Sequence, residues 1–419
     1  MFETISMIGL GYIGLPTATL FASRKKKVIG VDVSQHAVDT INQGKIHIVE
    51  PELDILVHAA VTEGWLRATT KPETADAFLI AVPTPFKDNH QPDLSYIEAA
   101  AKSIAPILRK GNLVVLESTS PVGATEQMAA WLAEARPDLT FPQQVGESAD
   151  VQVAHCPERV LPGHVVRELV TNDRVIGGMT KKASEMAVAL YKTFVEGDCI
   201  ITNARTAEMC KLTENSFRDV NIAFANELSM ICDQLDINVW ELIALANRHP
   251  RVNILQPGAG VGGHCIAVDP WFIVASNPEQ ARLIRTAREV NDHKPEWVLD
   301  KVKGAITDVL KHNPSRSLKD IKIACLGLAF KPDIDDLRES PAVQISKNIQ
   351  KIGCTTLVVE PNIDEHHQVM ENGFLYRELG VAMREADVIC ILVKHKEFLR
   401  DKNHIRECQN IIDAVGLLG

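Results

Sequence analysis

The sequence predicts an α/β protein in which two Rossmann-like, doubly wound domains are joined by a central helical region with a long helix. In the first half, short apolar runs alternate with helix-length segments, which is typical of βαβ units around a parallel sheet. A stretch without proline or glycine follows at 206–235, and the strand pattern returns near the C-terminal end. We therefore expect three domains, at residues 1–204, 205–311 and 312–419.

The N-terminal domain is predicted from apolar runs that have the length and composition of buried strands. Each run is followed by a polar or amphipathic segment, as the crossover connections of a parallel sheet require. The runs are TISMIGLG, KVIGVDV, AFLIAVP, LVVLEST and VQVAHCP.

The central and C-terminal regions follow from two further patterns. Apolar residues recur at helical spacing over 206–235, and further helices are expected at 239–246 and at 278–310, the latter with an interruption near Pro295. The segment HNPSRSLKD is typical of a linker. After it, the predicted strands of a second α/β domain are IKIACLGLAF, TTLVVEP, ADVICILV and NIIDAVG.

Composition and charge limit the class of protein. The chain has 419 residues, 46% of them hydrophobic, and a net charge of −10, so general affinity for nucleic acid or an anionic membrane is not expected. Its nine cysteines lack paired CxxC spacing, which argues against a disulfide framework or a metal site. Without a targeting segment or an apolar run of about 18 residues, we expect a cytoplasmic protein.

A dinucleotide-binding motif lies between the first predicted strand and the helix-compatible segment after it. Gly9, Gly11 and Gly14 form GxGxxG, and Asp32 follows at the end of the next strand-like run. Asp32 would accept hydrogen bonds from ribose hydroxyls and repel the 2′-phosphate of NADP, so NAD is the expected cofactor. The alternative is three turn glycines and a strand-end acid. The cofactor-lining residues expected here are Gly9, Gly11, Tyr12, Ile13, Gly14 and Asp32.

Two more loops are candidates because ligands bind at the carboxyl ends of strands in an open parallel sheet. They are VPTP, with Pro83 and Thr84, and ESTSPVG, with Ser118 and Thr119. Their hydroxyl groups could bind ribose or a catalytic water, or they could serve only as loop caps.

A glycine-rich segment, GAGVGGHCIAVDP, contains the cysteine that we expect to be reactive, Cys265. The glycines would let the backbone approach a bulky ligand and place amide groups around a developing oxyanion. A thiolate is favoured near a helix N-terminus or a cation, and His264 could supply charge. Asp269 follows four residues later. The alternative is a buried, inert thiol.

Two further segments carry candidate catalytic side chains. Lys211, Asn215 and Arg218 form a polar stripe on the long predicted helix, which indicates a site or a solvent-facing surface. Glu158 and Arg159, in CPERVLPG, follow a strand-like run, and Glu158 could hold or deprotonate water or have a structural role.

With these segments in order, the chain resembles the UDP-glucose and GDP-mannose 6-dehydrogenase family along nearly its whole length. The motifs that carry the resemblance are GLGYIGLP, PTP, ESTSPVG, CPERVLPG, AEMCKLTENSFRDVNIAFANE, GVGGHC and FKPDIDDLRESP. The resemblance implies an N-terminal NAD-binding domain, a central helical region that builds a homodimer, and a C-terminal domain that binds the UDP moiety of the substrate.

Residue roles carried over from the family describe an oxidation of a sugar 6-hydroxyl to a carboxylate with two molecules of NAD. In that scheme Cys265 is the nucleophile, and Lys211 and Asn215 bind the oxyanion and the substrate hydroxyl. Asp269 positions water and the lysine. Glu158 is the general acid/base, and Thr119 helps to position water. Arg251 would reach the substrate of the neighbouring subunit, and Lys331 and Arg338 would lie at the domain junction near the diphosphate and the cofactor. The remaining expected substrate contacts are Arg159, Val160, Arg218, His249, Asn253, Gly262 and Phe330.

One departure from the family pattern bears on the substrate. UDP-glucose enzymes of the family usually have the sequence GGSCFPKD in this segment. This chain has GGHCIAVDP instead, with Ile266 in place of an aromatic residue and Val268 in place of a lysine. This version is similar to the branch that acts on UDP-N-acetylhexosamines. Two rival functions stay open: a two-electron hydroxyacid dehydrogenase of the 6-phosphogluconate type, and a non-catalytic nucleotide-binding regulator.

Overall fold

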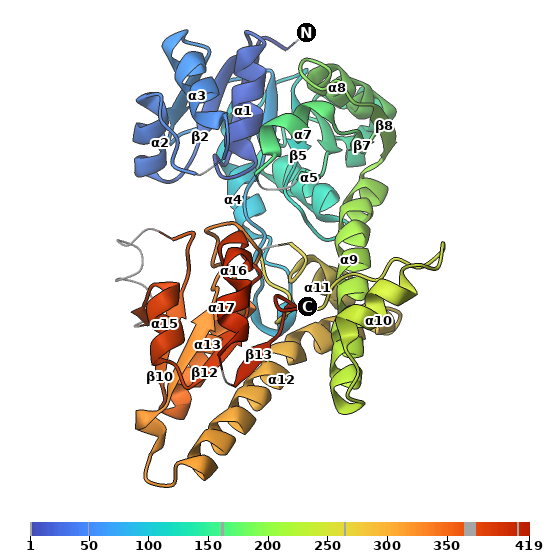
Figure 1. Ribbon diagram of the computed structural model, residues 1–419. Helices are drawn as coiled ribbons and strands as arrows, with labels where there is room; N and C mark the ends of the chain where they lie inside the picture. The colour runs from blue at the N-terminus through green and yellow to red at the C-terminus, as the bar shows by residue number, and fades with distance from the viewer. Residues whose placement is uncertain (1, 49, 161–162, 264, 364–373, 409) are drawn as a thin grey trace. The chain divides into compact units, whose positions relative to one another are not determined.

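The computed structural model describes residues 2–48, 50–160, 163–263, 265–363, 374–408 and 410–419. The chain divides into two compact units, Met1–Glu214 and Asn215–Gly419. The long helix α9 (Ala204–Gln234) runs through the boundary between the two units (Figure 1). Among the described residues, no helix is both long enough and apolar enough to cross a membrane.

The first unit is built on an eight-stranded sheet with the strand order β3-β2-β1-β4-β5-β6-β7-β8. All neighbouring strands are parallel except β6 and β7, which pair antiparallel. The strands are β1 (Thr4–Ile8), β2 (Lys27–Val31), β3 (Leu66–Thr69), β4 (Ala77–Ile80), β5 (Leu113–Leu116), β6 (Gln152–His155), β7 (Arg174–Gly178) and β8 (Cys199–Asn203).

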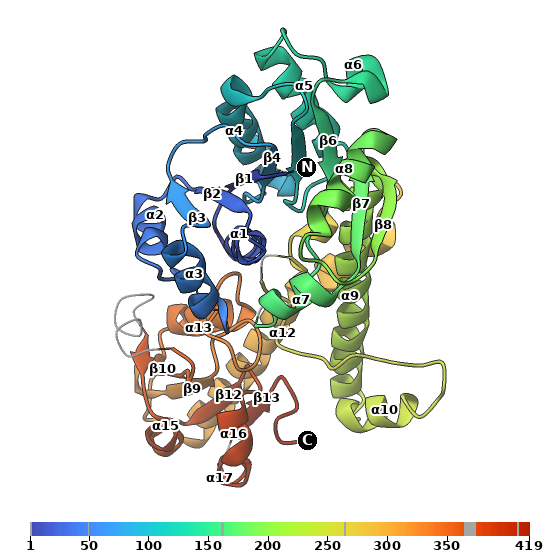
Figure 2. The same ribbon diagram turned by 90° about the horizontal axis from the view of Figure 1, so that it is seen from above.

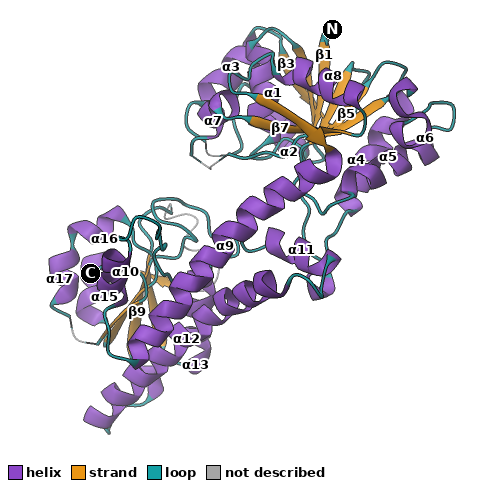
Figure 3. Ribbon diagram, turned by 90° about the vertical axis from the view of Figure 1, so that its right-hand side faces the viewer, coloured by secondary structure: helices purple, strands orange, loops and turns teal. Residues whose placement is uncertain are grey.

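Helices cover both faces of this sheet, which is the doubly wound arrangement (Figures 2 and 3). One core lies between the sheet and α1 (Gly14–Ser23), α2 (Gln35–Asn42), α3 (Leu53–Thr62), α7 (Val165–Thr171) and α8 (Lys181–Tyr191). The core on the other face includes side chains of α4 (Ser95–Ile104) and α5 (Ala124–Ala135). The short helices are α6 (Pro142–Val145), η1 (Asp88–His90), η2 (Ala105–Ile107) and η3 (Gly146–Ser148).

The second unit contains the rest of α9, further helices and a five-stranded parallel sheet of order β11-β10-β9-β12-β13. Its helices before the sheet are α10 (Val239–Ala246), α11 (Asp269–Ser276), α12 (Arg282–His312) and the short η4 (Leu318–Asp320). The strands are β9 (Lys322–Leu326), β10 (Thr355–Val359), β11 (Leu375–Tyr376), β12 (Val388–Ile391) and β13 (Ile411–Asp413), and the later helices are α13 (Pro341–Ile352), α15 (Leu379–Glu385), α16 (Lys396–Arg400) and α17 (Lys402–Arg406).

The predicted fold class is confirmed, with three differences of detail. Every predicted strand is present, but β3, β7, β8 and β11 were not predicted. The sheet of the first unit is not wholly parallel, because β7 runs antiparallel to β6. The expected break near Pro295 is also wrong, since α12 continues through this residue. Pro295 is buried, and the packing of a 31-residue helix retains the helical path despite one lost backbone hydrogen bond.

Candidate active site

The turn between β1 and α1 has the geometry that a dinucleotide pyrophosphate requires. Gly9 has φ +91°, and a Cβ there would lie 2.3 Å from the carbonyl oxygen of Ala81. A Cβ on Gly14 would lie 1.8 Å from the carbonyl oxygen of Gly9. In contrast, a Cβ on Gly11 would meet no described atom within 4 Å. Contacts with the protein's own backbone therefore require glycine at the first and third positions. The second glycine borders open space beside a helix N-terminus, where phosphate can approach.

Asp32 follows β2 and is fixed by the same turn. Its Oδ2 accepts a hydrogen bond from the backbone N–H of Leu10 at 2.9 Å, and its Oδ1 accepts one from Ser34 at 2.9 Å. A carboxylate has about four acceptor positions, so two positions stay available on this half-buried side chain for ribose hydroxyls. Tyr12, which is exposed, and the half-buried Ile13 lie at the start of α1.

Replacing Asp32 with asparagine is expected to weaken NAD binding by about tenfold to a hundredfold, because charge-assisted hydrogen bonds contribute about 1.5–3 kcal/mol. The preference for NAD over NADP should shrink as well, since the repulsion of a 2′-phosphate is lost. Titration calorimetry with both dinucleotides measures both effects. Asp39→Asn, an exposed acid on the neighbouring α2, is the control. Unchanged NAD affinity in Asp32→Asn would remove Asp32 from the cofactor site.

The loops after β4 and β5 are bound to each other. Ser118 accepts a hydrogen bond from the backbone N–H of Val82 at 2.9 Å, and its hydroxyl faces the carbonyl oxygen of Ile80. Thr84 donates to the carbonyl oxygen of Thr119. These hydroxyl groups hold the two loops together, and they therefore have the structural role of loop caps that was the alternative to ligand binding. Cofactor contacts by Pro83, Thr84, Ser118 and Thr119 stay a prediction.

In the first unit, Glu158 and Arg159 are held by separate ion pairs. Glu158 is buried, and its Oε2 lies 3.0 Å from Nη2 of Arg174 on β7. Arg159 is half-buried and lies 2.6 Å from Glu214 on α9, and Val160 packs against the core. The segment after Glu158 is also anchored, because the carboxylate of Glu50 accepts hydrogen bonds from two backbone N–H groups at the start of α7.

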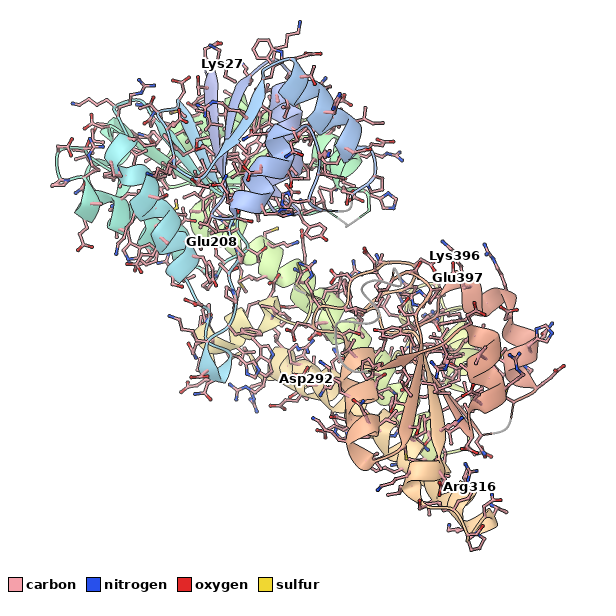
Figure 4. All side chains as sticks on the ribbon, turned by 90° about the vertical axis from the view of Figure 1, so that its left-hand side faces the viewer. Lys27, Glu208, Asp292, Arg316, Lys396 and Glu397 are labelled. Carbon is pink, nitrogen blue, oxygen red and sulfur yellow. The ribbon has the colours of Figure 1, made fainter. Side chains whose placement is uncertain are left out.

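The polar stripe on α9 is graded in exposure. Lys211 is half-buried, Asn215 is buried, and Arg218 is exposed, so the three side chains do not form one uniform solvent-facing surface. One turn before Lys211 lies the buried Glu208, which is labelled in Figure 4. Its carboxylate accepts hydrogen bonds from the backbone N–H groups of Gly123 and Thr125. Glu208 therefore fixes the start of α9 against the N-terminus of α5 and, with it, the position of Lys211.

In the second unit, Asn215 and Asp269 are brought together. The Asn215 side-chain amide donates to Oδ2 of the buried Asp269, the first residue of α11. The backbone N–H of Asp269 also donates to the carbonyl oxygen of Cys265 at 2.8 Å. All nine cysteines lie in the described part of the chain, and Cys265 is the exposed one. An exposed thiol just before a helix N-terminus is a suitable nucleophile. His264 lies outside the described residues.

The glycine cluster is closely packed by residues of its own unit. A Cβ on Gly262 would lie 2.5 Å from the carbonyl oxygen of Glu339, and a Cβ on Gly263, at φ +83°, would lie 2.9 Å from the ring of Phe330. The expectation that these glycines admit a ligand is therefore incomplete, because their own unit packs closely against them. Lys331 is half-buried, and the guanidinium of Arg338 is tied to Asp336 at 2.6 Å.

A buried polar network, here the α9–α12 polar cluster (Asp219, Asn226, Arg288 and Asn291), supports the Cys265 loop. Nη1 of Arg288 donates to Oδ1 of Asp219 at 2.6 Å and lies 3.5 Å from the carbonyl oxygen of Ile266. Asn226 bonds both to Asn291 and to the backbone N–H of Gly258, where the glycine-rich segment begins. Burial raises the pKa of Asp219, and Arg288 offsets this in part. The cluster was not predicted from the sequence.

His249, Arg251 and Asn253 lie in an exposed segment after α10. The backbone N–H of Arg251 donates to Nδ1 of His249 at 3.3 Å. The described contacts do not join these three side chains to Cys265, Asn215 or Asp269, so their place in a substrate site stays a prediction.

The second unit repeats the geometry of the first dinucleotide turn. Gly327, directly after β9, has φ +90°, close to the +91° of Gly9. The next residue, Leu328, donates its backbone N–H to Glu360 at 2.7 Å, as Leu10 does to the acid at the end of β2. The acids thus occupy corresponding positions at the ends of β10 and β2.

Glu360 is nevertheless enclosed by protein groups. Its carboxylate also accepts hydrogen bonds from the backbone N–H groups of Ala329 and Asn362, and it lies 3.2 Å from Nε2 of the fully buried His395. Because Nδ1 of His395 accepts the backbone N–H of Asp333, Nε2 carries the proton. Burial alone would raise the pKa of Glu360, but His395 and the backbone donors lower it below its usual value.

Comparisons with known proteins give a consistent result. The chain matches three models of the UDP-glucose/GDP-mannose dehydrogenase family: the NAD binding domain at residues 3–195, the central domain at 205–293 and the UDP binding domain at 324–418. It is 66% identical to UDP-N-acetyl-D-mannosamine dehydrogenase of Yersinia pestis over 99% of both chains. It is 65% identical to an NDP-N-acetyl-D-galactosaminuronic acid dehydrogenase of Ralstonia nicotianae, covering 99% of this chain and 96% of that one.

A solved structure extends the likeness to the fold. The UDP-D-ManNAc dehydrogenase of Pyrococcus horikoshii has a TM-score of 0.87 and 39% identity, covering 99% of this chain and 96% of that chain.

Proposed function

We infer the function from a premise that the comparisons establish: this chain belongs to the UDP-glucose/GDP-mannose dehydrogenase family. It is an NAD-dependent UDP-sugar dehydrogenase. We propose that it oxidises the 6-hydroxyl of UDP-N-acetyl-D-mannosamine to the carboxylate, giving UDP-N-acetyl-D-mannosaminuronate. The observation that carries this proposal is the 66% identity over the whole chain to dehydrogenases of that sugar. We propose further that the product serves bacterial surface polysaccharide synthesis.

The cofactor fits the first unit, because the Gly9–Gly14 turn is closed where the protein packs and open at Gly11, and Asp32 retains acceptor positions. The Gly9–Gly14 turn and Asp32 would hold NAD, which would supply the hydride acceptor for both oxidations at C6 of the sugar. Glycine positions and an accessible acid are the features that support dinucleotide binding.

The proposed covalent step explains the need for a thiol. The aldehyde formed in the first round can lose a second hydride only after a nucleophile makes its carbon tetrahedral. Cys265 adds to that carbon, and Lys211 and Asn215 stabilise the oxyanion of the thiohemiacetal. After the second oxidation the carbon is held as a thioester. Water positioned by Asp269, Glu158 and Thr119 attacks it, the C–S bond breaks, and Cys265 leaves as thiolate.

The three-part division at 1–204, 205–311 and 312–419 is part of the proposal, with NAD bound by the first part and the UDP moiety by the third. We also propose a homodimer in which Arg251 reaches the neighbouring subunit's site. An exposed apolar face supports it: Phe217, Phe224 and Ile231 recur every seven residues along α9, with 68%, 53% and 45% exposure. Exposed apolar surface of this kind is typical of an interface. The cytoplasmic location stays a prediction from the sequence.

The molar yield of NADH from a limiting amount of sugar tests the proposed reaction. Two NADH for each UDP-N-acetyl-D-mannosamine are expected because the alcohol-to-acid oxidation removes two hydrides. One NADH would support a two-electron dehydrogenase, and none would support a binding protein.

The same assay with UDP-N-acetyl-D-galactosamine, UDP-N-acetyl-D-glucosamine and UDP-glucose tests the substrate. The galactosamine sugar is the essential comparison, because identity to the Ralstonia relative is nearly as high as to the Yersinia relative. Faster turnover of any of the three would keep the chemistry and overturn the proposed specificity.

A further inference from the structure

Behind Glu158, the first unit contains a buried charged cluster drawn from four separate segments. The Arg174 cluster consists of Glu117 after β5, Glu158 after β6, Arg174 on β7 and Tyr191 on α8. The four side chains are buried, with exposures of 2%, 8%, 4% and 0% in that order. A buried charge is stable only when it is paired, so each member depends on the others for its charge state.

Arg174 is the centre of the cluster. Its Nη2 lies 3.0 Å from Oε2 of Glu158, and its Nη1 faces the sulfur of Cys156 at 3.7 Å. Its guanidinium carbon lies 4.6 Å from the centre of the Tyr191 ring, within the range of a cation–π contact. The guanidinium is therefore fixed by contacts on several sides.

Glu117 is the second carboxylate of the cluster. The hydroxyl of Tyr191 donates to its Oε1 at 2.6 Å. Within the described part of the protein, Oε2 of Glu117, Oε2 of Glu158 and the Nε and Nη2 atoms of Arg174 have no aligned hydrogen-bond partner. Arg174 and Glu158 are thus at ion-pair distance without hydrogen-bond alignment, and the two charges still attract because Coulomb attraction depends on distance and little on angle.

One cation and two carboxylates cannot all be ionised without a net buried negative charge. We propose that Arg174 and Glu117 are positioning residues for Glu158: Arg174 holds its carboxylate in place, and Glu117, held by Tyr191, acts through its own charge on proton transfer to it. This inference rests on the proposed role of Glu158 in hydrolysis of the thioester. Water then transfers a proton to Glu158 as its oxygen bonds to the acyl carbon and the C–S bond breaks, and an ionised Glu117 makes that transfer more favourable by like-charge repulsion.

Charges of the surrounding groups identify the member that titrates near neutral pH. Burial, assisted by the charge of the neighbouring Glu158, raises the pKa of Glu117 to about 7 against the opposing effects of Arg174 and Tyr191. Burial raises the pKa of Cys156 to about 12 and that of Tyr191 well above 10, so both stay neutral. The pKa of Arg174 is raised by Glu158 and its other neighbours despite burial, so it stays charged. Burial also raises the pKa of Cys199 on β8, although the charge of Arg174 opposes this.

The test is the pH dependence of kcat for acid formation, at saturating sugar and NAD, in wild type, Glu117→Gln, Tyr191→Phe, Arg174→Met and Arg174→Lys. Wild-type kcat should rise through an inflection near the pKa of Glu117, about 7. Glu117→Gln should lack this inflection with unchanged KM values. Tyr191→Phe should move it to higher pH, because a donor to the ionised form is lost.

Arg174→Met should lower kcat by about a hundredfold, because Glu158 loses the cation that holds it. It should also move the inflection to higher pH, because the charge of Arg174 lowers the pKa of Glu117. Arg174→Lys should restore part of both changes. Packing alone would not move a pH limb, and the matched control is Asp76→Asn, a half-buried carboxylate of the first unit that precedes β4 and accepts hydrogen bonds from the backbone N–H groups of Glu3 and Thr4.

A second measurement does not depend on turnover. A glutamate whose folded-state pKa is raised stabilises the fold below its unfolded pKa, and that stabilisation is lost as pH rises through the folded value. The stability difference between wild type and Glu117→Gln should therefore fall between about pH 4.5 and about pH 7. An inflection that persists in Glu117→Gln, or that disappears in Asp76→Asn, would overturn the inference.

Failure of the parent proposal gives a different result. If Glu158→Gln turns over as fast as wild type, Glu158 has no role in hydrolysis and the proposed mechanism fails. If Glu158→Gln is slow and wild type yields two NADH, but the pH limbs of the other variants do not move, the inference about Arg174 and Glu117 fails alone.

Discussion

Replacing Cys265 with alanine is expected to abolish formation of the uronate, with a loss of at least about a thousandfold in acid production. The reason is chemical: without the thiol, the aldehyde cannot become the tetrahedral adduct from which the second hydride leaves. The first oxidation does not need the thiol, so the variant should produce at most one NADH for each sugar. NADH absorbance and chromatographic detection of the acid measure the two quantities separately.

The matched control is Cys408→Ala, because Cys408 is a partly exposed thiol on the C-terminal side of the same unit, with its sulfur 3.7 Å from the carbonyl oxygen of His404. It should keep the yield of two NADH. Near-normal acid formation by Cys265→Ala would show that the carbon is never bound to this sulfur, and the thioester route would have to be abandoned.

Replacing Arg288 with methionine is expected to destabilise the second unit by about 3–5 kcal/mol, because removal of one partner leaves a buried charge uncompensated. The uncompensated group is Asp219, which is fully buried and lies 2.6 Å from the arginine. The carbonyl oxygen of Ile266, beside the nucleophile, loses a neighbouring donor in the same variant. Urea unfolding followed by circular dichroism gives the change in midpoint.

Asp292→Asn tests whether the effect comes from burial. Asp292 pairs with the same arginine, but its side chain is 50% exposed (labelled in Figure 4). Exposed pairs contribute about 0–1 kcal/mol, so this variant should unfold near the wild-type midpoint. Equal midpoints for Arg288→Met and wild type would show that the α9–α12 polar cluster does not stabilise the unit.

The sequence predicted those parts of the fold that short patterns determine. Buried strands such as β1 and β4 are continuous apolar runs, and GxGxxG lies between a strand and a helix, so both could be recognised locally. The strands that were missed lack that pattern. The run RVIGG of β7 ends in two glycines, and both Ile200 and Ile201 of the edge strand β8 are exposed. Antiparallel pairing of β7 depends on its partner strand and has no local sequence pattern.

The site could be predicted one residue at a time, but its long-range partners could not. Cys265 and Asp269 lie in one segment, whereas Arg174 meets Glu158 and Glu117 through pairing of strands far apart in the chain. The available signal was an arginine beginning an apolar run, which is unusual for a buried position. The glycine cluster was only partly understood, because its packing partner Phe330 is distant in sequence.

Two turns that share a glycine with φ near +90° and a backbone N–H bonded to the strand-end acid raise the question of competition for the same nucleotide. The enclosed Glu360 answers it through accessibility. Asp32 offers lone pairs at the surface, whereas the carboxylate at the corresponding place in the second unit is saturated by backbone N–H groups and His395. A ribose diol would have to displace that histidine before it could bind there. We therefore expect a dinucleotide ribose to bind at the first turn and not at the second, because protein groups already occupy the acceptor positions of Glu360.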